Sequence, residues 1–192
     1  GKIRIVTELK LPPEFDFKEM KRSDSFKTLE ISTFITLKKD SKEVEIQIEL
    51  NNNIKDHRLR VCFPSEANNH SYFTDSVFDI IERKIGLSEN FHKKLELETQ
   101  TRPQQNWTAI CDGIRGLAVI SSGLYETEVT DEILKPIKLT LLRSTEKTIL
   151  TNGEPKGQLQ KKLRYKLTVK PLSKEINPNE LFKTASKLAS GL

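Results

Sequence analysis

The sequence predicts an all-β protein, an antiparallel β-sandwich with a short C-terminal helix. Three observations indicate this fold. Apolar and polar residues alternate with a period of two along several short runs, and polar turn residues separate these runs. A single helix-start pattern lies close to the C-terminal end. With 192 residues, the chain is long enough for one domain with a hydrophobic core.

Residues 1–26 precede the first clear alternation. This segment contains Pro12-Pro13 and a run of mixed charges from Asp16 to Asp24. Because proline interrupts regular backbone pairing, we expect residues 1–26 to form a connecting arm. We expect this arm to be ordered only in part and to lie against a neighbouring domain.

Residues 27–171 carry the alternating runs and form the predicted sandwich domain. The clearest run has apolar side chains at every second position from Val44 to Leu50, with acidic residues and Gln47 between them. This pattern predicts a half-buried strand with an acidic outer face. The inward-facing residues of the other predicted strands are Ile31, Thr33, Ile35 and Leu37; Leu59, Val61 and Phe63; Leu95 and Leu97; Trp107 and Ala109; Leu117 and Val119; and Leu163, Tyr165, Leu167 and Val169.

Polar turn sequences separate these strands. They are Lys39–Lys42, Asn51–Asn53, Asp112-Gly113, Ser122-Gly123 and Asn152-Gly153. Asp112-Gly113 is the sharpest of them, because a two-residue hairpin turn needs positive φ, which Asp and Gly tolerate. Apolar runs flank this turn on both sides, so we expect a hairpin over Asn106–Ser121.

Residues 172–192 are predicted to form a C-terminal helical tail. Asn177 provides a side-chain cap, Pro178 suits the first helical position, and Glu180 completes a capping box. Leu181, Ala185 and Leu188 then line one helical face, and Gly191 can end the helix.

The distribution of charged and apolar residues argues against nucleic-acid and membrane partners. A net charge of +5 arises from 32 Lys and Arg residues spread among 27 acids. The one dense basic run, from Lys161 to Lys166, alternates with apolar residues as a strand does, whereas nucleic-acid sites gather Arg and exposed aromatics. No apolar run approaches the roughly 20 residues of a membrane span. We therefore expect no nucleic-acid and no membrane partner.

Cys62 and Cys111 are the only cysteines, and they lack the C-x-x-C spacing of a structural zinc site. We expect both to be buried as small apolar residues, which is the usual environment of free cysteine. Two unpaired thiols favour a reducing, cytoplasmic location.

Four phrases stand in a characteristic order. They are DHRLRVCFP (Asp56–Pro64), HSYFTDSVFDIIER (His70–Arg83), RPQQNWTAICDGIRGLAVISSGL (Arg102–Leu124) and LTLLRS (Leu139–Ser144). At these spacings the sequence resembles the β-rich region after the catalytic barrel in glycoside hydrolase family 38, the α-mannosidases and mannosylglycerate hydrolases. The resemblance covers roughly residues 3–169. It is interrupted at Tyr125–Glu128, where the family has a Pro-Glu-Tyr type of continuation, and the tail after Pro171 resembles no known segment.

The resemblance implies a supersandwich-like fold and a longer parent enzyme. That parent would be a retaining, metal-dependent glycosidase that hydrolyses α-mannosidic bonds. Its Asp nucleophile and its zinc or other divalent metal, held by two His and two Asp, would lie in the barrel. This chain would support the barrel and shape the far wall of the cleft without being catalytic alone. The implied partners are the parent's own barrel, its α-mannoside or mannosylglycerate substrate, and a second copy in a homo-oligomer.

The residues of this chain argue separately against local catalysis. Its three histidines, at positions 57, 70 and 92, include no H-x-D pair, so we expect neither a metal site nor another cofactor site within it. His57 is interpreted as a hydrogen-bonded loop residue. No G-x-S-x-G elbow or phosphate-binding glycine loop is present.

Several polar residues remain as candidate contacts to the substrate cleft. Asp75, Asp79 and Glu82 are spaced so that they could converge on a sugar, as paired glycosidase carboxyls must. The alternative, which we favour, makes them turn and surface acids of a loop leading into a strand at Val77–Ile81. Arg83, Arg115 and Arg143 each lie in one of the phrases, and a guanidinium at such a place can fix a loop carboxylate or reach the cleft. Asp75, Asp79, Arg115 and Arg143 are the candidate contacts to the substrate cleft.

Two other functions are compatible with a β-sandwich. A stand-alone carbohydrate-binding module would need an exposed aromatic platform, and Trp107, the only Trp, is interpreted as a buried packing anchor rather than a sugar platform. A basic nucleic-acid-binding domain would bind with an affinity that falls steeply with salt. An isolated supporting domain should instead expose an apolar face that normally packs on the barrel.

Overall fold

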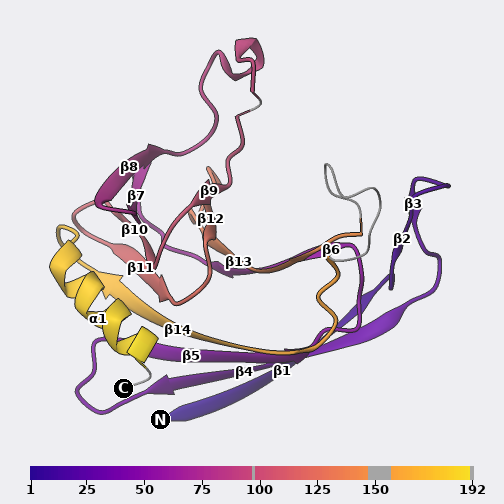
Figure 1. Cartoon of the computed structure of the whole chain (residues 1–192). Coiled ribbons are helices and arrows are strands. Elements are labelled where there is room, and N and C mark those ends of the chain that lie inside the picture. The colour runs from indigo at the N-terminus through magenta and orange to yellow at the C-terminus, as the bar shows by residue number, and fades with distance from the viewer. Residues whose placement is uncertain (97, 147–156, 191–192) are drawn as a thin grey trace.

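The computed structural model describes residues 1–96, 98–146 and 157–190. Its main feature is an eight-stranded antiparallel sheet with the strand order β1-β4-β5-β14-β11-β10-β7-β8 (Figure 1). The strands are β1 Lys2–Leu11, β4 Lys27–Leu37, β5 Val44–Asn51, β7 Ser71–Ser76, β8 Asp79–Lys84, β10 Trp107–Cys111, β11 Gly116–Ser121 and β14 Lys162–Leu172. Strand β14 therefore joins two groups of strands that come from earlier parts of the chain.

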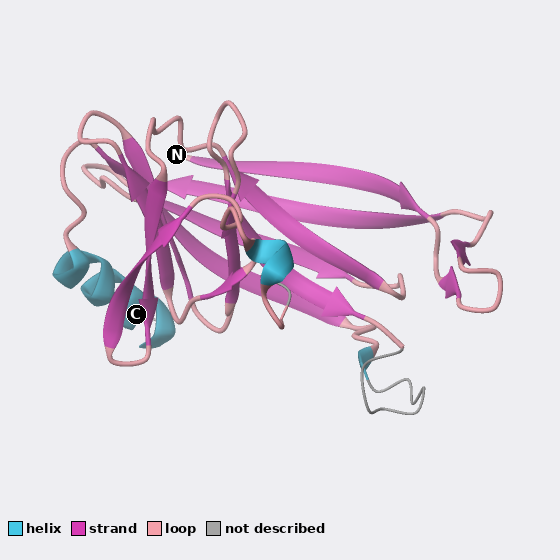
Figure 2. Cartoon of the chain, turned by 90° about the horizontal axis from the view of Figure 1, so that it is seen from above, coloured by secondary structure: helices cyan, strands magenta, loops and turns pink. Residues whose placement is uncertain are grey.

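A smaller four-stranded sheet packs against the large one, with the order β6-β13-β12-β9. Its strands are β6 His57–Phe63, β9 Arg102–Pro103, β12 Glu126–Val129 and β13 Ile137–Ser144. The remaining elements are the β2–β3 pair, Phe15–Asp16 with Lys21–Arg22, the 3₁₀ helix η1 Phe91–Lys93 and the helix α1 Pro178–Ser190. Figures 1 and 2 show the β2–β3 pair at the end of the molecule opposite α1. The predicted all-β antiparallel sandwich with a short C-terminal helix is confirmed.

Two apolar clusters hold these layers together. The first lies between the sheets and joins Leu29, Ile48 and Leu167 of the large sheet to Ile137 and Leu139 of the small one. The second lies on the outer side of the large sheet, beneath α1, and contains Trp107, Ala109, Ala118, Ile120, Leu181 and Ala185. Successive strand residues point to opposite faces. Strands β10 and β11 can therefore supply both clusters, and this part of the sheet is buried on both sides.

The alternating runs predicted from sequence are confirmed in six strands: β4, β5, β6, β10, β11 and β14. The expected hairpin over Asn106–Ser121 forms from β10 and β11, but its turn lies one residue later than predicted. The amide of Asp112 donates to the carbonyl of Arg115 at 3.1 Å, which leaves Gly113 and Ile114 in the turn. Gly113 has φ +88°, a conformation that glycine adopts without a steric cost.

The N-terminal segment differs from the expected connecting arm. Residues 2–11 form β1, which pairs residue by residue with Lys27–Thr36 of β4. Ile3, Ile5 and Leu9 lie at strand period, and the backbone groups of β1 that face β4 form hydrogen bonds with it. The Pro12-Pro13 pair ends β1 but does not prevent pairing before it.

Two predicted strands are wrong. Leu95 lies in a connection after η1 and is fully exposed at 104%, while Leu97 lies outside the described residues. The strand expected at Val77–Ile81 begins only at Asp79, because Val77 and Phe78 form the tip of the β7–β8 hairpin. Phe78 has φ +72° and is fully exposed, which suits a turn and not a strand.

The expectation that both cysteines are buried is also wrong. Cys62 is exposed and Cys111 is half-buried. Cys62 stands between Val61 and Phe63, which face the core, and strand alternation therefore turns its thiol to the outer face. The predicted Asn152-Gly153 turn lies outside the described residues.

The C-terminal helix starts where the sequence predicts. The amide of Glu180 donates to Oδ1 of Asn177 at 3.3 Å, which satisfies one free backbone donor of the first turn. Leu181 and Ala185 are buried against β11 and β14, whereas Lys183 is exposed. In the described part of the chain, no helix is long and apolar enough to cross a membrane.

Removing the Leu181 side chain should loosen α1 from the sheet. Because Leu181 is 1% exposed, Leu181→Ala is expected to lower the free energy of unfolding by about 2–5 kcal/mol. Urea denaturation followed by the fluorescence of Trp107, which lies in the same cluster, measures this change. Lys183→Ala on the exposed side is the matched control and should leave the midpoint nearly unchanged. Equal midpoints for the two variants would contradict the docked position of α1.

Candidate functional site

Asp75 has a structural position in the large sheet. Its buried carboxylate accepts hydrogen bonds from the backbone amides of Gln105 at 3.1 Å, Asn106 at 2.7 Å and Trp107 at 2.9 Å. The side-chain amide of Asn106 donates to it at 2.9 Å. A carboxylate that receives several amide hydrogen bonds is held firmly and stabilises the loop that surrounds it. Asp75 therefore fixes the start of β10.

Asp79 and Glu82 do not complete a catalytic pair with Asp75. In the β7–β8 register Asp75 lies opposite Ile80 and Ser76 lies opposite Asp79, so the side chains of Asp75 and Asp79 point to opposite faces of the hairpin. Asp79 is exposed and accepts from the amide of Ile80 at 2.7 Å. Glu82 accepts from the Ser71 hydroxyl at 2.6 Å. Each of these acids thus has its own local role.

The predicted arginines lie on separate elements. Arg83 donates to the Thr74 hydroxyl at 2.9 Å and to the Pro103 carbonyl at 3.1 Å, and burial lowers the pKa of its guanidinium. Arg115 lies in the β10–β11 turn, at the far end of β10 from Asp75. It pairs loosely with Glu66 at 3.4 Å, and both side chains are exposed, so this ion pair adds little stability.

Asp112 organises the loop that carries Arg115. Its carboxylate accepts from the amides of Arg115 at 2.8 Å, Asn68 at 2.7 Å and Ile114 at 2.9 Å. These three donors, the Arg115 amide above all, hold the pKa of Asp112 down to about 2. Asp112 therefore ties the β10–β11 turn to the loop before β7.

Arg143 belongs to a group of charges on the outer face of the small sheet. We name this group the charged ladder. It consists of Arg58 and Arg60 of β6, Thr140 and Arg143 of β13, and Glu126 and Glu128 of β12.

Glu126 is the centre of the charged ladder. It accepts from the Thr140 hydroxyl at 2.6 Å and lies 3.4 Å from both Arg58 and Arg143. Glu128, only 8% exposed, pairs with Arg60. Arg58 and Arg60 of β6 reach Glu126 and Glu128 of β12 across β13, which lies between these two strands.

The charged ladder is a rigid polar surface. Its carboxylates are engaged by guanidinium groups, and Arg143 keeps 58% of its side chain exposed. Such a surface can accept another polar protein surface or the hydroxyls of a sugar. Of its members, sequence reasoning identified only Arg143. Arg58 and Arg60 could also have been predicted, because they alternate with the inward-facing residues of β6.

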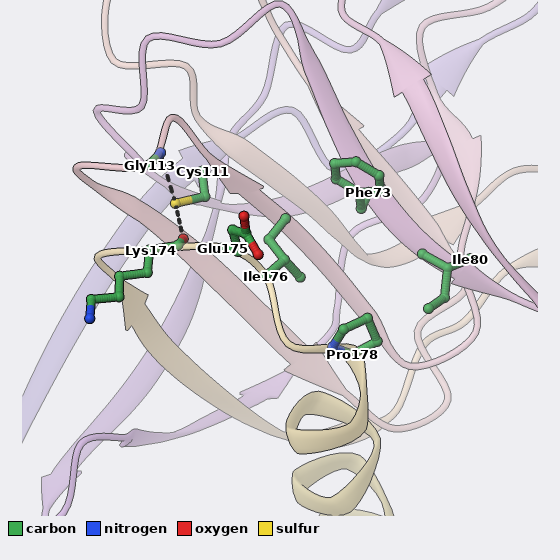
Figure 3. Close-up of a pocket in the computed structure, with 8 residues that line it drawn as sticks. All are labelled: Phe73, Ile80, Cys111, Gly113, Lys174, Glu175, Ile176 and Pro178. Carbon is green, nitrogen blue, oxygen red and sulfur yellow. Dashed lines mark hydrogen bonds between the residues drawn. The ribbon is translucent and has the colours of Figure 1, made fainter.

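A pocket of about 350 Å³ opens beside the start of α1 (Figure 3). Apolar atoms line most of it, contributed by Phe73, Ile80, Ile176 and Pro178. At its edge the Cys111 thiol donates to the Lys174 carbonyl at 2.7 Å. The pocket is suited to a small apolar group and does not gather the carboxyl pair that glycoside hydrolysis requires.

The histidine and tryptophan candidates are explained by packing. His57 is the first residue of β6 and not a loop residue, and its two buried ring nitrogens have no hydrogen-bond partner among the described residues. Burial, followed by the nearby Arg22 charge, lowers the pKa of its imidazole. Trp107 is fully buried and meets Phe182 edge-on at 5.8 Å, which is incompatible with a sugar platform. Among the residues that the structure describes, no three His, Cys, Asp or Glu side chains gather as metal ligands.

The fold and the positions of these residues indicate the class of protein. The fold is a two-sheet antiparallel β-sandwich in which Asp75 fixes the start of a strand and Glu126 is the centre of an ion-pair group. The sequence profile of the glycosyl hydrolases family 38 C-terminal domain matches residues 6–148, and the chain belongs to this family.

Known relatives support the same assignment. A putative mannosylglycerate hydrolase of Halalkalibacterium halodurans is 28% identical over 123 residues, which is 64% of this chain and 13% of that protein. The structure of an alpha-mannosidase from Enterococcus faecalis V583 matches 99% of this chain with TM-score 0.82 and 26% identity. A second family 38 protein from Enterococcus faecalis matches 99% with TM-score 0.79 and 25% identity.

The chain spans only a small part of these relatives. It covers 22% and 23% of the two solved chains and 13% of the curated relative. Because 99% of this chain is matched in the solved structures, the similarity includes the C-terminal tail, for which the sequence phrases gave no counterpart.

Substitution of Asp75 tests whether its hydrogen bonds stabilise the folded domain. Asp75→Ala leaves three backbone amides without their acceptor, so we expect the free energy of unfolding to fall by about 3 kcal/mol. Asp79→Ala, on the same hairpin but exposed, is the control and should unfold at nearly the wild-type urea concentration. A stable Asp75→Ala variant would contradict the role assigned to this carboxylate.

The lowered pKa of Asp112 predicts an acid-sensitive contribution to stability. A carboxyl whose pKa is lower in the folded state stabilises above its ordinary value of 3.8, and this stabilisation is lost as the pH falls toward about 2. Wild type should therefore be more stable than Asp112→Asn at pH 6, and the difference should shrink between pH 4 and 2. Thermal unfolding of both proteins across this range measures it. A difference that stays constant with pH would refute the assignment.

Proposed function

We propose that this chain serves as the C-terminal β-sandwich domain of a family 38 α-mannosidase, a retaining enzyme that hydrolyses α-mannosidic bonds. One observation carries the proposal. The fold matches over 99% of the chain at TM-score 0.82 with an alpha-mannosidase of which it covers 22%. The catalytic machinery would belong to the remaining part of such an enzyme, called the parent below. The domain alone would be inactive.

The domain's role in the parent would be support of the catalytic barrel. The sandwich is stiffened by two apolar clusters and by the hydrogen bonds to Asp75. Its charged ladder and the exposed Phe78 at the β7–β8 tip offer a polar and an apolar contact to a neighbouring domain. Asp79, Arg115 and Arg143 are exposed and remain candidate contacts to the substrate cleft. Asp75 would act on the cleft only by positioning the start of β10.

The metal expected for the parent would be bound outside this domain. Zinc or another divalent ion requires three or four converging His, Cys or carboxylate donors, and the described residues do not bring such donors together. When bound in the barrel, such a metal polarises substrate oxygens as a Lewis acid. Residues of this chain would contribute by supporting the cleft that holds the sugar.

Substrate and setting follow from the same comparisons. An α-mannoside is the first candidate substrate of the parent, and mannosylglycerate is the second because a relative carries that name. The free thiols of Cys62 and Cys111 favour a reducing, cytoplasmic environment. We also infer that copies of this chain associate as a homo-oligomer.

Side-by-side assays of the parent and of this 192-residue chain test the function. With a chromogenic α-mannoside and added zinc, we expect hydrolysis by the parent and none by the chain alone. Arg143→Ala in the parent should raise KM more than it lowers kcat if Arg143 binds substrate, and Arg164→Ala on the large sheet is the matched control.

Two results would contradict this proposal. Hydrolysis by the isolated chain would mean that its own carboxylates are catalytic. A parent that hydrolyses neither the chromogenic mannoside nor mannosylglycerate would not be an α-mannosidase of this kind.

A further inference from the structure

Among the strands of the described residues, β1 is the last strand on one side of the large sheet and pairs only with β4. Leu37 of β4 exchanges two hydrogen bonds with Gly1, at 2.9 and 2.7 Å, so this residue pair is of the hydrogen-bonded type. Because such pairs alternate along an antiparallel strand, odd-numbered residues of β1 turn their N–H and C=O groups toward β4. Even-numbered residues, from Lys2 to Lys10, turn theirs toward the open edge.

This edge lacks two of the features that block strand pairing, proline and a bulge, and its charged residues are Lys2, Arg4, Glu8 and Lys10. The ten residues of β1 include no proline, and their register with β4 has no bulge. Apolar side chains remain exposed at Ile3 (63%), Ile5 (47%) and Val6 (47%). A long, regular and partly apolar edge strand is a template for another strand.

The charges of β1 favour a particular neighbour. Glu8 lies directly opposite Glu30 of β4, an arrangement in which like charges repel. Among the described residues, neither glutamate has a Lys or Arg within ion-pair distance. Arg4 is held on the same face of the strand as Glu8, where it donates to the Ser32 hydroxyl at 3.1 Å and lies over the Phe34 ring. A strand that places a cation opposite Glu8 would relieve the repulsion.

We propose that β1 pairs antiparallel with β1 of a second copy of this chain, around a two-fold axis at Val6. In this register Arg4 of each copy faces Glu8 of the other, Ile3 faces Leu9, and Val6 faces Val6. The dimer would join two eight-stranded sheets into one continuous sheet. The pairing concerns the sheet edge alone and does not depend on the proposed enzymatic function.

The hydrogen-bond pattern restricts the register. The outward-facing groups belong to even-numbered residues, so an even residue of one copy must face an even residue of the other. A pair centred on Thr7 would set Arg4 against Lys10. A pair centred on Ile5 would place Lys2 opposite Glu8, but it would leave Arg4 opposite Val6 and Lys10 unpaired. The Val6 register keeps residues 2–10 paired and forms both Arg4–Glu8 contacts, although Lys2 then faces Lys10 at the exposed ends.

Sedimentation equilibrium of the 192-residue chain at several concentrations tests the proposal. We expect a monomer–dimer equilibrium. Val6→Lys places two cations at the axis and should weaken the dimer at least about tenfold. Lys84→Glu, on the exposed edge strand β8 at the other side of the sheet, is the matched control and should dimerise like wild type.

A charge exchange tests the register itself. Arg4→Glu alone sets two acids against each other and should weaken the dimer, and the double variant Arg4→Glu/Glu8→Arg should restore it. Circular dichroism confirms that each variant is folded. The proposal is overturned if wild type stays monomeric at every concentration. It is also overturned if the dimer persists in Val6→Lys and Arg4→Glu, or if the double variant fails to recover.

Discussion

The carboxylate of Asp75 is the interaction on which much of the domain depends. It gathers the amides of three successive residues and thereby fixes the point at which β10 begins. Trp107 follows at once and enters the cluster beneath α1, where Phe182 meets its ring edge-on. One buried acid on β7 thus connects a hairpin, the central strands and the C-terminal helix. Both oxygens of this carboxylate accept hydrogen bonds from residues 105–107, so the acid has a structural role in the domain.

The two sheets serve different purposes. The large sheet provides the frame, because both of its faces are covered near β10 and β11. The small sheet presents the charged ladder, whose ion pairs span three strands. The apolar frame and the paired surface charges therefore lie on separate layers of the fold.

Local patterns in the sequence were sufficient for much of the fold but for little of the candidate site. Alternation located β5, and the Asn177 cap located the start of α1. The edge strand β1 was missed because the Pro12-Pro13 pair outweighed the alternation before it.

The site depends on register between distant strands, which no short window of sequence contains. Arg58 and Glu126 are 68 residues apart and meet only because β13 lies between β6 and β12. The spacing of Asp75 and Asp79 likewise suggested convergence, but the intervening turn places them on opposite faces of the hairpin.

The central position of β14 has a consequence for biosynthesis. The strands β1-β4-β5 and β11-β10-β7-β8 are made first, yet only residues 162–172 join them. A nascent chain must therefore hold two half-sheets with open inner edges until β14 is made, and unpaired strand edges of this kind favour aggregation.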